Sequence, residues 1–262
     1  AIFTFQETSV MRPLVTLYPL SGSGKVAEVP VYPTISAAAV NEATDLSNTA
    51  VNPTSATITA SEVGVMTTLT DLGASSASRN VGADIGKLFG EAIAKKVETD
   101  LVGLCSSFTT NTAGAAGTEV TADLLFKAQA QLRTLSIPAP YYGVFHPKAV
   151  FNLKKTLTQA GYGTSSAAMS EIGNEALRNG FIGRIAGIDV FENANLSIDV
   201  NDDSVGGVFH PASIGLAMKE EFKIETQRDA SLRATEIVAS IVYGKAVVKE
   251  SFGVAVTTDA AF

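Results

Sequence analysis

Two histidines are the residues best suited to chemistry, and both occupy the same place in a repeated octapeptide. The repeat is "GVFHPKAV" at 143–150 and "GVFHPASI" at 207–214. A metal site would need two ligands besides His146 and His210, and no cysteine or acidic cluster adjoins either histidine in sequence. Each histidine directly precedes a proline, which favours the first turn of a helix. We therefore predict two strand-to-helix corners in which the histidine caps or packs, with metal binding or catalysis as the alternative.

The stretch "DVNDDS" at 199–204 begins like a calcium-binding loop, with oxygen-bearing side chains at its first, third and fifth positions. The sixth position is Ser204, where the loop's sharp turn needs glycine. The twelfth position is His210, where a calcium loop has a bidentate glutamate. These two departures favour a polar turn without a metal.

The stretch "GRIAGIDVFEN" at 183–193 has the spaced glycines of a nucleotide-binding loop. A dinucleotide fingerprint places such glycines between a strand and a helix, and the helix N-terminus holds the phosphate. Here Gly183 and Gly187 are followed by a strand-like run, and the sequence has no P-loop and no G-x-S-x-G elbow. We interpret the glycines as a tight turn between paired strands. No catalytic, cofactor-binding or metal-binding residue is predicted in the chain.

The only cysteine, Cys105, lies in the apolar run "DLVGLCSSF". A single cysteine cannot form a disulfide within the chain. We predict a buried structural thiol rather than a reactive one.

Composition and charge argue against one class of function. The chain has 262 residues, 46% of them hydrophobic, and a net charge of −7. A protein that grips nucleic acid by its phosphates needs clustered lysine and arginine, which this composition does not favour. A protein that encloses nucleic acid without gripping it remains compatible with the charge.

The elements that would position any site begin with an arm and a hairpin. Residues 1–20 contain two prolines and no helical period, so we expect an extended arm. The stretches 25–35 and 57–72 alternate as strands do, and a polar stretch joins them. Because both flanks have the strand pattern, an ordered hairpin is favoured over a disordered linker.

A long helix is predicted over about 77–107. Its apolar residues recur at helical spacing along one stripe: Val81, Ile85, Leu88, Ala92, Val97, Leu101 and Leu104. Gly82, Gly86 and Gly90 fall four residues apart on a neighbouring ridge, and each costs about 1 kcal/mol relative to alanine. They are either tolerated, or they let the helix bend or pack closely against strands at 222–245.

The rest of the chain predicts an α/β region and then long strands. In order, we expect a helix over 121–135, a strand over 141–146, a helix over 147–157, a short helix over 170–180, a helical turn over 211–219, and strands over 222–228, 234–250 and 253–259. Small and polar residues at 158–176 predict a mobile or partner-ordered loop.

The order of these elements, with three segments in particular, resembles the major capsid protein of tailed bacteriophages, which has the Hong Kong 97-like fold. The segments are "GFIGRIAGIDVFENANL", "GVFHPASIGLAMKEEFKIETQRDAS" and "IVASIVYGKAVVKESFGVAV", the last containing the Tyr243–Gly244 pair. The resemblance covers nearly the whole chain and implies an α+β fold. It divides the chain into an N-arm at 1–20, an E-loop at 21–62, a peripheral domain with a spine helix at 63–108, an axial domain at 109–221, peripheral return strands at 222–245 and C-terminal strands shared with the axial domain at 246–262.

The function implied by the resemblance is structural rather than enzymatic. Subunits of this family form pentamers and hexamers that close into an icosahedral virion shell around double-stranded DNA, assembled in the host cytoplasm. The implied partners are other copies of the chain, portal and scaffolding proteins and in some cases a cement protein. No membrane and no sequence-specific DNA contact is implied. The alternatives are an encapsulin-type compartment shell, which shares the fold, and a soluble α/β enzyme.

The resemblance also singles out the turn at 227–236, because this tip meets neighbouring capsomers around threefold positions in the family. Arg228, Asp229, Arg233 and Glu236 lie within it. We predict ion pairs between subunits there, with a solvated turn as the alternative.

In some members of this family, an isopeptide bond between an E-loop lysine and an asparagine of a neighbouring subunit links the shell covalently. Here no lysine occurs between Lys25 and Lys87, so we expect a shell held by noncovalent contacts.

Overall fold

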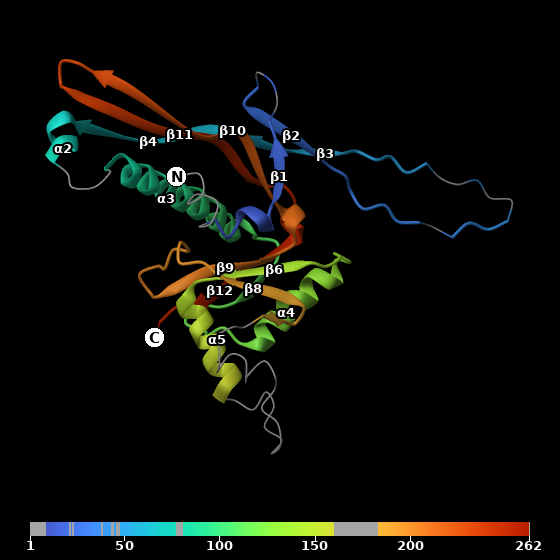
Figure 1. Ribbon diagram of the computed structural model, residues 1–262. Helices are drawn as coiled ribbons and strands as arrows, with labels where there is room; N and C mark the ends of the chain where they lie inside the picture. Colours follow the sequence, from blue (N-terminus) through green and yellow to red (C-terminus); the bar gives the residue numbers. More distant parts are fainter. Residues whose placement is uncertain are drawn as a thin grey trace.

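The computed structural model has two large β-sheets, one above the other in Figure 1, and a two-stranded sheet that forms the base of a long projecting arm. The structure describes residues 9–20, 22, 24–37, 39–42, 45, 48–76, 81–159 and 183–261. The predicted helix over 170–180 and nearly all of the predicted loop at 158–176 lie outside these residues. Within the described residues, no helix is both long enough and apolar enough to cross a membrane.

The upper sheet has four strands in the order β1-β10-β11-β4. Their bounds are β1 Thr16–Pro19, β4 Ser61–Thr70, β10 Ile214–Asp229 and β11 Ala234–Val247. β1 runs parallel to β10, and the other neighbours are antiparallel. The predicted helical turn over 211–219 is wrong beyond its first residues. A short 3-10 turn, η3 (Pro211–Ser213), leads directly into β10, so this strand begins eight residues earlier than predicted.

Helix α3 (Val81–Val102) lies along one face of the four-stranded sheet and continues into the 3-10 turn η2 (Gly103–Ser107) (Figure 1). The predicted helix is therefore present, but its predicted apolar stripe is partly wrong. Leu88 is 61% exposed and Ala92 is exposed, whereas Phe89 and Ile93 are buried. Val97 and Leu101 of the predicted stripe are buried, so the prediction fails only around residues 88–93, where the buried residue is the next one along the chain.

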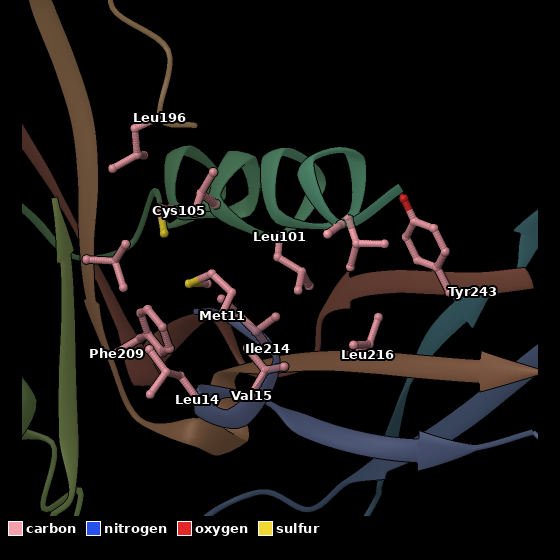
Figure 2. Packing of buried hydrophobic residues seen from close by; sticks show 14 of the residues in the cluster. Met11, Leu14, Val15, Leu101, Cys105, Leu196, Phe209, Ile214, Leu216 and Tyr243 are labelled. Atoms are coloured by element: carbon pink, nitrogen blue, oxygen red, sulfur yellow. The ribbon is translucent and has the colours of Figure 1, made fainter. Parts of the chain in front are cut away.

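The N-terminal segment is part of the main core rather than a free arm. Met11, Leu14 and Val15 are buried around the 3-10 turn η1 (Arg12–Leu14). Figure 2 shows Met11 between α3 and the strands of the sheet, close to Leu101. The expectation of an extended arm is therefore wrong for residues 11–19, because three apolar side chains and the pairing of β1 with β10 hold this segment on its own subunit.

The lower sheet has six strands in the order β5-β12-β9-β6-β8-β7. Their bounds are β5 Thr112–Gly114, β6 Tyr141–Phe145, β7 Arg184–Ile185, β8 Ile188–Glu192, β9 Asp203–Phe209 and β12 Gly253–Asp259. Helices α4 (Ala122–Thr134) and α5 (Pro147–Gln159) pack below this sheet (Figure 1).

Neighbouring residues on the central strands of the lower sheet point into two different cores. Val208 joins the core with α4 and α5, whereas Phe209 joins the core with α3. In the same way, Phe145 faces the helices and Val144 faces α3. The lower sheet is therefore apolar on both faces, and its α3 side continues into the core of the upper sheet.

A hairpin is present, as predicted, because β2 (Val26–Val31) pairs antiparallel with β3 (Thr54–Thr59). The single second strand predicted over 57–72 is wrong, since β3 ends at Thr59 and residues 61–70 form β4 of the four-stranded sheet. Beyond these strands, the described residues between Tyr32 and Pro53 extend away from both sheets (Figure 1). We call residues 26–59 the hairpin arm. At its base, Ile58 is buried and Ala60 is hydrogen-bonded to Lys25, which fixes the direction in which the arm leaves the body.

Candidate assembly interface

The outer end of the four-stranded sheet is the tip at which contacts between subunits are predicted. It consists of the β10–β11 turn and the short helix α2 (Asp71–Ser76). The guanidinium of Arg228 donates two hydrogen bonds of 2.6 Å to the Asp71 carboxylate. The backbone N–H of Asp71 donates to the carbonyl of Arg233 at 3.0 Å. The hydrogen bonds from Arg228 lower the pKa of Asp71, so the pair stays charged over the ordinary pH range.

The turn itself is shaped by Asp229. Its carboxylate accepts hydrogen bonds from the hydroxyl and the backbone N–H of Ser231 and from the N–H of Leu232. These bonds lower the pKa of Asp229, that from the Ser231 hydroxyl most strongly. Arg233 follows with φ of 47°, in the left-handed region, which turns the chain back into β11. Short polar side chains that bond their own backbone are typical of such turns.

The four residues predicted for contacts between subunits therefore divide into two pairs. Arg228 and Asp229 have partners within their own subunit, and Arg228 uses Asp71, which is not among the predicted residues. The sequence carries no signal for this pair because its members lie 157 positions apart. Arg233 and Glu236 form no ion pair with any residue that the structure describes. A bridge from Arg233 or Glu236 to a second subunit stays a prediction.

The glycine ridge of α3 does not form the predicted close contact with strands at 222–245 along its whole length. Gly82 is exposed, and a Cβ atom built on Gly86 would meet no described atom within 4 Å. The close-packing prediction is therefore wrong at Gly86 within the subunit. Gly90 is buried, so a packing role remains a proposal at this position alone.

The hairpin arm carries large apolar side chains that are largely exposed. Tyr32 is 63% exposed and Ile35 is 54% exposed, and Val40 and Val51 are also exposed. An open cleft of about 300 Å³ lies between the base of the arm and residues 248–251. Apolar surface of this kind marks a contact site in a soluble protein.

Both histidines cap the corners that follow their strands, as predicted. His146 Nδ1 accepts the N–H of Lys148 at 3.2 Å, and His210 Nδ1 accepts the N–H of Ala212 at 3.1 Å. Burial lowers the pKa of both imidazoles, and Lys148 lowers that of His146 further. Each ring is therefore neutral near pH 7 with Nδ1 free to accept. The second corner is a 3-10 turn rather than a helix.

The other two sequence motifs also make turns. Asp199 accepts the N–H groups of Asn201 and Asp203, which closes the "DVNDDS" stretch into a polar turn. Ala186 and Gly187 have φ of 52° and 69° between β7 and β8, the signs found in a type I′ hairpin turn. The described residues contain no cluster of three or more histidine, cysteine or acidic side chains that could hold a metal ion.

Solved structures of phage capsids share the arrangement of the tip, the hairpin arm and the two large sheets. The capsid of the cyanophage P-SCSP1u has a similar structure, with a TM-score of 0.76 and 17% identity over 97% of this chain and 89% of that one. The head of Helicobacter pylori bacteriophage KHP40 gives a TM-score of 0.73 at 12% identity, over 97% and 92% of the two chains. The capsid of a native GTA particle gives 0.73 at 14% identity, over 96% and 90%.

These likenesses confirm the Hong Kong 97-like, α+β fold. No curated protein sequence is significantly similar to this chain. A family model described as phage capsid protein matches residues 80–257, which include α3, the long strands β10 and β11 and most of the six-stranded sheet. The chain belongs to the phage capsid protein family and is a major capsid protein, a structural subunit of the shell.

Proposed function

We propose that the subunit assembles into pentamers and hexamers that close as an icosahedral shell around double-stranded DNA. In this proposal the chain catalyses no reaction, and its contacts with neighbours are noncovalent. Assembly takes place in the host cytoplasm, with portal and scaffolding proteins, and in some shells a cement protein, as further partners.

The observation that carries this proposal is the hairpin arm. It holds Tyr32 and Ile35 more than half exposed, and the arm projects away from both sheets of its own subunit (Figure 1). An isolated soluble protein gains nothing from extending such a segment into water. A neighbouring copy that lies under the arm would bury these side chains, and a ring of copies would bury all of them.

The net charge supports enclosure of DNA rather than adhesion to it. A charge of −7 per subunit repels phosphates, so packed DNA would slide against the wall instead of sticking to it. Weak contacts are sufficient to hold the shell, because each copy binds several neighbours at once.

The division into domains belongs to the same proposal. The N-arm at 1–20, the E-loop at 21–62, the peripheral segments at 63–108 and 222–245, the axial domain at 109–221 and the shared end at 246–262 are boundaries taken from the resemblance. The boundary at 221/222 falls within the continuous strand β10. We infer that β10 joins the two domains as one piece.

The test is the size and content of the purified particle. Electron microscopy and sedimentation should show closed shells in the megadalton range. After nuclease treatment, shells from infected cells should retain protected double-stranded DNA. Shells that contain a cargo protein and no DNA would favour an encapsulin-type compartment, and a small oligomer would contradict assembly altogether.

A further inference from the structure

A buried carboxylate without a cation lies at the junction of the two sheets. Glu98 belongs to α3 and is 1% exposed. No lysine, arginine or histidine among the described residues lies within salt-bridge distance of it. It also lies in the second half of the helix, where the negative end of the helix dipole disfavours an anion. A buried charge in such a place must be held by hydrogen bonds.

Four hydrogen bonds from three donors reach this carboxylate. The Ser9 hydroxyl donates to Oε1 at 2.7 Å. The Met11 N–H donates to both oxygens, at 2.9 Å and 3.2 Å. The Asn193 amide donates to Oε2 at 2.7 Å. The donors come from sequence positions 87 to 95 residues away, so the contact is made only in the folded protein.

The donors belong to opposite parts of the molecule. Asn193 directly follows β8 and is bound to the six-stranded sheet, because its N–H donates to the carbonyl of Phe145. Its Oδ1 accepts the N–H of Asn195, which fixes the orientation of the amide. Ser9 and Met11 precede β1, an edge strand of the four-stranded sheet. Glu98 therefore joins the N-terminal segment to the six-stranded sheet.

We propose that Glu98 is a latch that makes the docking of residues 9–15 depend on the position of the six-stranded sheet. While Asn193 is in place, both carboxylate oxygens are satisfied and the N-terminal segment is held. A shift of the six-stranded sheet relative to α3 withdraws the Asn193 amide. The buried carboxylate then lacks a donor, the site admits water, and the hold on the Met11 N–H weakens. A shift of the six-stranded sheet thereby loosens the contact that holds the N-terminal segment.

The variant Asn193→Asp tests this coupling, because it changes a donor into a second carboxylate and keeps the acceptor for Asn195. Asn193 forms no hydrogen bond with Ser9 or Met11 in the structure. Hydrogen–deuterium exchange is measured on the full chain, in the peptide that covers residues 9–16. We expect exchange there to rise about tenfold or more, the size of effect that follows loss of a hydrogen bond to a charged group.

The matched control is Asn111→Asp. Asn111 is also partly buried and donates its amide to the carbonyls of Ser251 and Gly253, whereas the donors to Glu98 are Ser9, Met11 and Asn193. We expect it to leave exchange at residues 9–16 unchanged.

The double variant Glu98→Gln with Asn193→Asp exchanges the two partners of this hydrogen bond, so that the amide is at position 98 and the carboxylate at position 193. The new amide at position 98 can donate to the new carboxylate, while its oxygen still accepts from Ser9 and Met11. We expect exchange at residues 9–16 to return toward that of the unaltered protein. Unchanged exchange in Asn193→Asp would overturn the latch. If that variant loosens the whole protein, recovery in the double variant supports the latch and no recovery refutes it.

Discussion

Substitution of Gly244 by alanine tests how the direction of the hairpin arm is set. Gly244 lies on β11, directly beneath the point where the chain passes from β3 to β4. A Cβ atom at this position would lie 2.6 Å from the carbonyl oxygen of Thr59, 2.7 Å from its carbonyl carbon and 2.9 Å from the nitrogen of Ala60. All three are backbone atoms, so no side chain can rotate out of the way.

The magnitude follows from these distances. Ordinary contacts of a Cβ atom begin near 3.4 Å, so the base of the arm has to move by roughly 0.8 Å. Overpacking of this kind destabilises the folded protein by about 1–3 kcal/mol. Alanine also lowers the conformational entropy of the unfolded chain, which offsets about 0.4–1 kcal/mol of that loss. We expect Gly244→Ala to lower the free energy of unfolding by about 1–2 kcal/mol, which lowers Tm by about 2–8 °C. The displaced arm should also reduce the yield of closed shells.

Calorimetry of the subunit and electron microscopy of the assembled product measure the two effects separately. The control is Gly86→Ala, the same chemical change at a site where the new Cβ meets no described atom. It should raise stability by up to about 1 kcal/mol, because alanine is the better helix former. If Gly244→Ala matches the unaltered protein in both Tm and shell yield, the close contact between Gly244 and Thr59 does not determine the direction of the hairpin arm.

Four further outcomes are expected. Arg233→Glu should leave the subunit folded by circular dichroism but block shell closure, and normal particles would contradict a contact at the tip. Hydrogen bonds from Thr109 and Thr110 lower the pKa of Glu250 to about 2, below its ordinary value. Glu250 therefore contributes stability at pH values above its ordinary pKa, and this is lost as pH falls through about 2, so the Tm difference between Glu250→Gln and the unaltered protein should be present at pH 6 and vanish near pH 2. Burial raises the pKa of Cys105 to about 12, so a thiol reagent at pH 8 should modify it only after unfolding. Boiled in detergent, shells should give one band near 27.2 kDa, and a ladder that resists boiling would show a covalent lock.

Local signals in the sequence predict several of the turns and caps. The histidine caps and the turn at Gly187 each depend on residues within a few positions of one another, although Ala186 rather than Gly183 is the second turn residue. Backbone preferences and short hydrogen bonds decide such features, and they are nearly independent of the rest of the fold.

The buried face of α3 is predicted less well because the helix is apolar on more than one side. Leu88 and Phe89 are adjacent, and the 3.6-residue period fits a stripe through either. Which of them is buried depends on how the helix rolls on the four-stranded sheet, and residues far along the chain decide this. Phe89 is the one that packs in the core, and Leu88 is left for solvent or a neighbour.

The contacts that join distant segments have no signature in the sequence. Glu98 looks like a surface charge in an amphipathic helix, and its donors lie about 90 positions away. The N-terminal segment likewise resembles a free arm in sequence. Its two prolines and short apolar run do not reveal that it pairs in parallel with β10, about 200 residues further along the chain. Only the closed fold brings these groups together.

Strand β10 has a mechanical consequence for a shell built of identical copies. It starts in the core and ends at the tip, and its pairing with β11 shifts register twice, between Met218 and Lys223. Irregularities of this kind are places where a ribbon bends most readily. From Lys223 to the tip the strand is about 20 Å long, so a bend of about 10° there swings the tip through about 3–4 Å. In the proposed shell, such a bend would let the same tip reach neighbours set at different angles around fivefold and sixfold rings.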